Sequence, residues 1–246
     1  MRLPLPLPRW IAHRGGGSLA PENTLAGIRL AARLGCRAVE FDVMLSADGT
    51  PFLIHDETLE RTTNGQGRVC ATPDDVLLAL DAGDGEHIPT LAAAAALCRQ
   101  YGLLANVEIK PAAGYERQTA EVVARQCVAL WQGAAILPLI SSFSMAALAI
   151  ARDLAPAIPR GLLFDAVPAD WHRQLQSVGG VTLHCNARQL GGEVLAESAA
   201  KGVPVLCYTV NSLAESEKLL ANGVSAVFTD RLDLFAGACA IKDASR

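Results

Sequence analysis

Residues 11–56 read IAHRGGGSLAPENTLAGIRLAARLGCRAVEFDVMLSADGTPFLIHD, and this stretch decides the fold. Three short apolar runs lie in it or at its edge, and each carries or precedes a polar residue that can take part in catalysis. Apolar runs bounded by turn residues are typical of buried strands, so these polar residues lie at or near strand ends. The runs and their polar residues are 10–12 with His13, 38–43 with Glu40 and Asp42, and 51–54 with His55.

The segments between these runs predict one helix and one hairpin. Asn23 or Thr24 is a suitable N-cap for a helix with an apolar face that ends at Gly35. The Asp-Gly pair at 48–49 is a hairpin-turn signal, and it returns residues 51–54 antiparallel to the strand before it. We therefore expect the histidine after this ribbon to lie near the two carboxylates.

The chain beyond this stretch divides into an irregular segment and a regular one. Residues 57–89 are loosely patterned and interrupted by glycine and proline, which predicts a small cap over the site. From residue 90 onward, helical and strand patterns alternate. The expected helices are 74–80 inside the cap, then 91–101, 116–131, 144–153, 168–177, 193–201 and 212–222. The expected strands after 10–12 and 38–43 are 103–110, 137–143, 160–164, 181–186, 203–210 and 224–229.

Eight strands separated by helices predict an α/β fold, a (β/α)8 TIM barrel. The chain has 246 residues, close to the ~250 that such a barrel usually needs. A doubly wound open sheet has the same local pattern and is the competing fold, but the total of eight strands favours the barrel. We expect residues 1–246 to form one domain, with 57–89 as a small insertion after the second barrel strand.

The composition excludes several function classes. A net charge of -4 does not supply the basic face that nucleic-acid binding needs, and no uninterrupted apolar run is long enough to insert in a membrane. Three alternating prolines in MRLPLPLPRW, at the start, would break a signal-peptide helix. The seven cysteines are scattered without a CxxC pair, which indicates reduced thiols. We expect a cytoplasmic protein.

The acidic residues at the strand ends predict a metal site. Glu40 and Asp42 are two apart on one strand and therefore point to the same side, and Glu108 ends the next barrel strand. Oxygen ligands with no cysteine beside them suit a hard divalent cation, Mg²⁺ or Ca²⁺, rather than zinc.

Basic residues beside the carboxylates predict phosphoryl transfer. Arg14 and Lys110 are suitable partners for a phosphate, and the glycine run 15–17 lets backbone amides come close to a ligand. Histidine is the residue type best suited to proton transfer near neutral pH, so one of His13 and His55 can take a proton and the other can give one.

An ordered set of motifs resembles the glycerophosphodiester phosphodiesterase family, most closely its small cytoplasmic bacterial members. The resemblance implies a distorted TIM barrel with a small insertion that hydrolyses glycerophosphodiesters to sn-glycerol 3-phosphate and an alcohol. It also implies one divalent cation on Glu40, Asp42 and Glu108, acid–base catalysis by His13 and His55, and phosphate binding by Arg14 and Lys110. The motifs are His13-Arg14-Gly15, residues 21–24 (PENT), Glu40-x-Asp42, His55-Asp56, 61–65 (RTTNG), 108–110 (EIK), 142–143 (SF), 208–211 (YTVN) and 229–230 (TD).

Two alternative functions keep the same fold: a lysophospholipase D-like hydrolase of longer lipids, and a sugar-phosphate-binding barrel without catalysis. Other polar residues have structural interpretations beside functional ones. His184 shares a strand face with Asn186 and either contacts substrate or is a hydrogen-bonded core histidine. The remaining expectations are loop shaping and helix capping by Glu22 and Asn23, loop ordering by Arg61 and Asn64, packing or glycerol contact by Tyr208, and a barrel-mouth position for Asp230.

Overall fold

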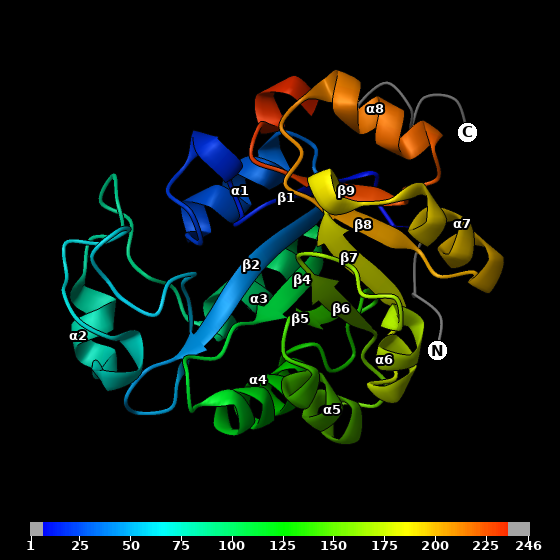
Figure 1. The fold of residues 1–246 in the computed structure, drawn as a ribbon. Coiled ribbons are helices and arrows are strands. Elements are labelled where there is room, and N and C mark those ends of the chain that lie inside the picture. Colours follow the sequence, from blue (N-terminus) through cyan, green and yellow to red (C-terminus); the bar gives the residue numbers. More distant parts are fainter. Residues whose placement is uncertain (1–6, 236–246) are drawn as a thin grey trace.

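The computed structural model describes residues 7–235, and in this range eight parallel strands close into a barrel (Figure 1). β1 pairs with β9 on one side and with β2 on the other through Ala12 and Val39, so the barrel has no open edge. This closure confirms the TIM barrel and excludes the open sheet. The barrel strands are β1 (Trp10–Ala12), β2 (Ala38–Leu45), β4 (Leu104–Ile109), β5 (Leu139–Ser142), β6 (Arg160–Phe164), β7 (Thr182–Asn186), β8 (Val205–Tyr208) and β9 (Ala226–Thr229).

Helices connect the strands and surround the barrel (Figure 1). Their positions match the predicted alternation, with boundaries shifted by a few residues. The largest shift is at the helix predicted from residue 168, which begins at Trp171 because residues 168–170 form a turn. The helices are α1 (Leu25–Arg33), α2 (Asp74–Ala79), α3 (Leu91–Tyr101), α4 (Glu116–Leu130), α5 (Met145–Leu154), α6 (Trp171–Ser177), α7 (Gly192–Lys201) and α8 (Leu213–Ala221).

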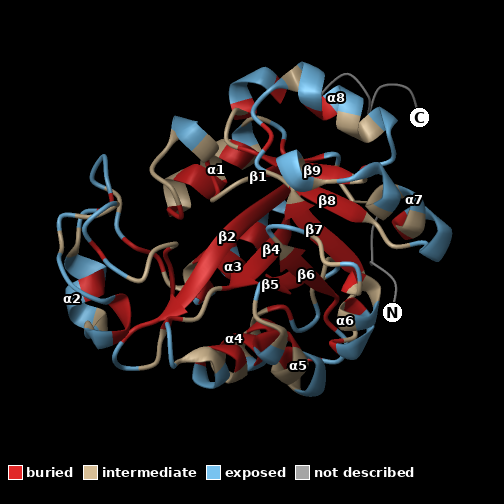
Figure 2. Ribbon diagram, viewed as in Figure 1, coloured by how far each residue is buried: buried red, intermediate tan, exposed pale blue. Residues whose placement is uncertain are grey.

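Two apolar layers hold the barrel together. The larger layer lies between the outward faces of the strands and the helices, and it contains Phe41, Trp131 and Trp171, each at most 2% exposed. The smaller layer fills the inside of the barrel, around Leu104 and Leu206. Figure 2 shows the consequence, since the strands are buried along most of their length while the outer faces of the helices are exposed. The interior layer blocks the barrel, so a ligand can enter only from one end.

The insertion forms a small lobe with apolar contacts of its own. The predicted ribbon is β3 (Pro51–Leu53), antiparallel to β2 with Val43 opposite Leu53. Beyond it, residues 57–89 fold around α2, to one side of the barrel and past the end of β2 (Figure 1). A separate cluster that includes Phe52, Leu77 and Ile88 holds the lobe on the hairpin. The lobe therefore places the residues after His55 beside the barrel mouth.

The glycine run after β1 serves backbone packing, and the expectation that its amides approach a ligand was wrong. All three amides donate to backbone carbonyls, of Glu40, Arg14 and His13 in turn. A Cβ on Gly17, which has φ +58°, would lie 2.2 Å from the Asp230 carbonyl oxygen. The glycines are needed because the loop passes too close to other backbone for a side chain.

Two further expectations concern cysteines and membrane insertion. The six cysteines between residues 7 and 235 are buried thiols, whereas Cys239 and residues 1–6 lie outside the described residues. Between residues 7 and 235, no helix is long and apolar enough to cross a bilayer.

Candidate active site

The site lies directly above the apolar interior layer of the barrel. Ile11, Ala38 and Leu104 belong to this layer and lie on three different strands. On each of these strands the next residue that faces inward, two positions further along the chain, is polar. A cavity of about 220 Å³ opens there at the carboxyl ends of the strands. All seven predicted site residues line it, together with Asn106, Phe143, Leu163, His184, Tyr208, Thr209 and Phe228.

Three buried carboxylates converge in this cavity. Glu40, Asp42 and Glu108 each offer one oxygen, and these oxygens lie within 4.8 Å of one another. Burial and the neighbouring carboxylates raise the pKa of Glu40 well above its ordinary value and raise the pKa of Glu108 to about 8. Burial opposes ionisation of Asp42 as well, but Lys110 and other positive neighbours outweigh it and lower the pKa. The cluster therefore needs additional positive charge before all three groups can ionise.

The donor set fits a divalent cation. It consists of carboxylate oxygens only, and Oε1 of Glu108 is buried without a hydrogen-bond partner. Hard cations such as Mg²⁺ and Ca²⁺ prefer such oxygens, and a bound cation would pair this atom and offset the repulsion.

Two basic side chains border the carboxylates. Lys110 Nζ lies 3.3 Å from Asp42 Oδ1, and Arg14 Nε lies 3.8 Å from Asp42 Oδ2. Arg14 adopts φ +49°, and its backbone N–H donates to Glu40 Oε2 at 2.9 Å, which holds the loop against the cluster. Its guanidinium donates from Nη1 to Glu22 at 3.0 Å, while Nε is buried and has no hydrogen-bond partner. Both side chains are thus positioned to contact an anion in the cavity.

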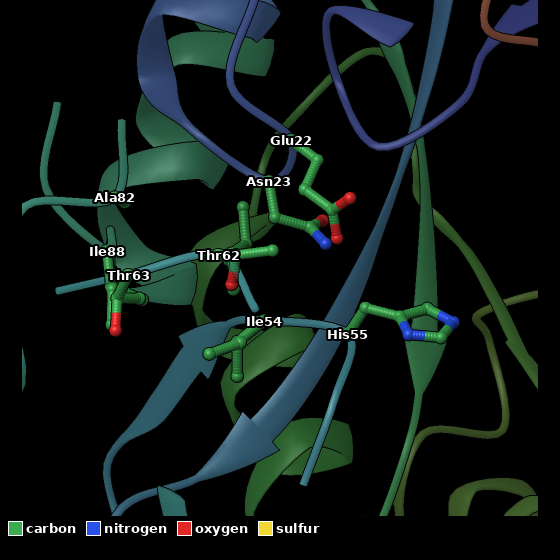
Figure 3. Close-up of a pocket in the computed structure, with 9 residues that line it drawn as sticks. Glu22, Asn23, Ile54, His55, Thr62, Thr63, Ala82 and Ile88 are labelled. Carbon is green, nitrogen blue, oxygen red and sulfur yellow. The ribbon is translucent and has the colours of Figure 1, made fainter. Parts of the chain in front are cut away.

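Each of the two predicted catalytic histidines is oriented by an aspartate. His13 Nδ1 lies 2.7 Å from Asp230 Oδ1, and His55 Nδ1 lies 2.6 Å from Asp56 Oδ1. In Figure 3 the imidazole of His55 extends away from the labelled lobe residue Thr63. Because Nδ1 is bonded to a carboxylate in both rings, Nε2 is the atom left to exchange a proton with a ligand. Burial lowers the pKa of His55, which favours the neutral ring.

Several residues support the site in ways that were not predicted from the sequence. Thr24 is the N-cap of α1, whereas Asn23 donates from Nδ2 to Asp42 Oδ2 at 3.0 Å and accepts from the Asp42 backbone at 3.1 Å. The orienting role of Asp56 could have been suspected from its place next to His55. That of Asp230 could not, because 217 residues separate it from its histidine.

Arg61 connects the two halves of the site and does more than order its loop. Its Nη1 and Nη2 each donate to Glu22 at 2.8 Å, and its Nε donates to Asp56. Glu22 also accepts from Arg14, and Asp56 also contacts His55. One side chain in the lobe therefore holds two carboxylates in place, Glu22 beside the phosphate-binding candidate and Asp56 beside the catalytic candidate. Figure 3 shows Glu22 above His55, on a separate segment of the chain.

We expect Arg61→Ala to lower kcat by roughly 10-fold, the lower end of what loss of an outer hydrogen-bond partner costs. The thermal midpoint should change by less than about 3 °C, because the side chain is 46% exposed and exposed ion pairs contribute little. Steady-state kinetics and thermal melting measure the two effects. Arg68→Ala is the matched control, since Arg68 pairs with Glu57 in the same lobe, at 3.1 Å. Equal kcat values for both variants would contradict the connecting role.

A parallel barrel with acidic, basic and imidazole side chains at the carboxyl ends of its strands has the architecture of a metal-assisted phosphoryl-transfer hydrolase. Comparison with known proteins identifies the family. The sequence profile of the glycerophosphoryl diester phosphodiesterase family matches residues 13–234, so the chain belongs to this family. The resemblance inferred from the motifs is confirmed.

Individual relatives agree with this assignment over nearly the whole chain. A glycerophosphodiester phosphodiesterase of Caldanaerobacter subterraneus subsp. tengcongensis is 32% identical over 89% of this chain and 93% of its own length. Among solved structures, an Oleispira antarctica phosphodiesterase in complex with the product sn-glycerol-3-phosphate superposes with a TM-score of 0.89 and 38% identity, covering 94% of this chain and 96% of that one. A glycerophosphodiester phosphodiesterase from Agrobacterium tumefaciens is 27% identical, with a TM-score of 0.77 and coverage of 94% and 100%.

Proposed function

We propose that this protein hydrolyses glycerophosphodiesters to sn-glycerol 3-phosphate and an alcohol. The observation that carries the proposal is that three carboxylate oxygens within 4.8 Å share one cavity with two basic side chains and two imidazoles. The names of the relatives support the substrate class, because one is a glycerophosphodiester phosphodiesterase and another was solved with sn-glycerol-3-phosphate as its product.

Arg14 and Lys110 are proposed to bind the phosphate group of the substrate. They approach the carboxylate cluster from the side of Asp42 and line the same cavity. A guanidinium and an ammonium both donate hydrogen bonds to phosphate oxygens, and the interaction gains strength in a partly buried site. These contacts would also place the phosphorus atom between the two histidines.

His13 and His55 are proposed to move the protons. One imidazole takes a proton through Nε2 from the glycerol 2-hydroxyl as its oxygen bonds to phosphorus, and the other gives a proton from Nε2 to the alcohol oxygen as the bond from that oxygen to phosphorus breaks. Water then opens the resulting cyclic phosphate, with the two proton transfers reversed, and sn-glycerol 3-phosphate is formed. Asp230 and Asp56 hold the rings through Nδ1, at 2.7 and 2.6 Å, and stabilise each ring when it is protonated.

Glu40, Asp42 and Glu108 are proposed to hold one divalent cation, Mg²⁺ or Ca²⁺. When bound, the cation supplies positive charge that stabilises the phosphoryl oxygens in the transition state and acidifies the attacking hydroxyl. Asn23 would keep Asp42 in place, because it bonds both the carboxylate and the backbone of that residue. We further propose that the enzyme works in the cytoplasm, which agrees with buried thiols at all six described cysteines.

The direct test is incubation of the purified protein with glycerophosphocholine, followed by enzymatic detection of glycerol 3-phosphate. We expect product with Mg²⁺ or Ca²⁺ present, no product in excess chelator, and recovery when the cation is restored. Full turnover in chelator would refute the metal assignment. Tight binding of sn-glycerol 3-phosphate with no hydrolysis of any diester would favour the alternative of a non-catalytic binding barrel.

A further inference from the structure

Buried polar atoms without a hydrogen-bond partner are concentrated in the active-site cavity. Among the described residues five such side-chain atoms occur, and four of them belong to residues that line the cavity. Arg14 Nε and Glu108 Oε1 belong to the phosphate and cation groups of the proposed function. Asn106 Oδ1 and His184 Nδ1 have no role in it so far. The fifth atom, Thr119 Oγ1, lies on α4 and not in the cavity.

Asn106 and His184 are each held in place by their other polar atom. Asn106 Nδ2 donates to Ser141 Oγ at 2.9 Å, and His184 Nε2 lies 3.0 Å from Thr182 Oγ1. The His184 ring also packs against Phe228, with ring centroids 5.4 Å apart. The two side chains are 2% and 0% exposed. Since one polar atom of each is already bonded, the other is left for whatever occupies the cavity.

These two side chains occupy the inner end of the cavity. Asn106 precedes Glu108 by two residues on β4, which places it roughly 6–7 Å deeper along the strand. Leu163 and Phe228 are neutral side chains of the same cavity, and Phe228 also belongs to the apolar interior layer. Glu40, which pairs with Asn106 in the strand register, marks the start of the charged part, to which Arg14 and Lys110 also belong. The cavity therefore has one end suited to a phosphate and another suited to a small uncharged polar group.

The hydrogen bonds that Asn106 Oδ1 and His184 Nδ1 can form determine which uncharged polar group fits the inner end of the cavity. The amide oxygen of Asn106 only accepts hydrogen bonds, so its partner must be a donor. Burial lowers the pKa of His184 to about 3, so the ring is neutral and offers either a donor or an acceptor. A quaternary ammonium group has no N–H to donate, and a phosphate dianion has no donor either. A hydroxyl group can donate to Asn106 and also pair with His184.

We propose that Asn106 and His184 form a hydroxyl-binding subsite that takes the primary hydroxyl of the glycerol unit, the one farthest from the phosphate. This inference rests on the proposed function and specifies how the substrate lies, with the phosphate outward and the glycerol end inward. A ligand without this hydroxyl leaves two buried polar atoms unpaired and binds more weakly. The subsite therefore selects glycerol phosphates against phosphates of simpler diols.

Calorimetric titration of the metal-loaded protein tests the subsite with two ligands. We expect sn-glycerol 3-phosphate to bind roughly 10-fold more tightly than propane-1,2-diol 1-phosphate, which lacks only this hydroxyl. His184→Gln keeps a polar atom near Nε2 for Thr182 and removes the one at Nδ1, so the difference should fall to about 2-fold. Asn106→Ala should have a similar effect. Thr119→Val removes an unpartnered buried oxygen outside the cavity and should leave the 10-fold difference intact.

The variant His184→Asn distinguishes a loss of hydroxyl binding from a loss of protein stability. It keeps a polar atom near the position of Nδ1 and loses the bond to Thr182, so we expect it to retain most of the discrimination even if its thermal midpoint drops. Equal affinity of the wild-type protein for both ligands would overturn the subsite, as would an equal loss for both ligands in His184→Gln. Failure of the proposed function has a different signature, because the ligands would still be discriminated while glycerophosphocholine is not hydrolysed with either cation.

Discussion

Glu108→Gln is expected to lower the rate of glycerophosphocholine hydrolysis by roughly 10³-fold, a loss of about 4 kcal/mol of transition-state stabilisation. The variant removes one of the three carboxylates that converge within 4.8 Å and so weakens the hold on the cation. Added Mg²⁺ or Ca²⁺ should not restore the rate. Initial rates measured across a cation titration test this expectation.

The same substitution should stabilise the protein when it is stripped of metal. Burial and repulsion by Asp42 raise the pKa of Glu108 to about 8, so its charge opposes folding at pH 8 in the absence of a cation. Removing roughly 1–2 kcal/mol of such repulsion would raise the thermal midpoint in chelator by about 2–8 °C. Glu121→Gln is the matched control, because this glutamate is paired with Arg117 on α4. We expect the control substitution to change neither the hydrolysis rate nor the thermal midpoint in chelator by much. If Glu108→Gln kept wild-type activity, the proposed role of the Glu108 carboxylate in holding the cation would be wrong.

His13→Gln and His55→Gln are each expected to lower the hydrolysis of glycerophosphocholine by roughly 10²–10⁴-fold, the usual contribution of general acid–base catalysis. The two variants should differ with glycerophospho-p-nitrophenol, because nitrophenolate leaves without needing a proton. The histidine whose loss is largely compensated by this leaving group is the general acid. The other histidine is then the base, and its variant should be impaired with both substrates.

His87→Gln serves as the control for the histidine pair. His87 lies in the lobe, where its Nδ1 contacts the Leu80 carbonyl at 2.8 Å, and we expect unchanged rates with both substrates. The assignment of the two histidines as acid and base would be contradicted if either His13→Gln or His55→Gln kept the wild-type rate on glycerophosphocholine. Equal losses with both leaving groups in both variants would show that neither histidine protonates the leaving alcohol.

Local sequence patterns were sufficient to predict the strands and most of the candidate site. Alternating strand and helix signals gave the right count of eight barrel strands, because each strand buries an apolar run against its own helix layer. The pairing of Glu40 with Asp42 follows from the two-residue period of a strand, and Glu108 follows from its place at the end of the next barrel strand. The three acids meet because parallel strands present their carboxyl ends at one face of the barrel.

Contacts between distant loops were less predictable. The glycine run at 15–17 was interpreted as a ligand cradle, but it packs on backbone near Asp230, and no local pattern records that approach. The N-cap of the first helix was predicted as Asn23 or Thr24, because both residue types are common caps. Thr24 is the cap, whereas the Asn23 side chain bonds Asp42 instead.

The sequence by itself determined the strand and helix periodicity, the residue types available at the strand ends, and the family. Only the tertiary structure decided which aspartate orients each histidine, that Arg61 connects Glu22 with Asp56, and that Asn106 and His184 keep a polar atom for the cavity. The physical reason is that periodicity is a property of neighbouring residues. A hydrogen bond across the barrel depends instead on strand register, loop path and burial, which exist only when the barrel has closed.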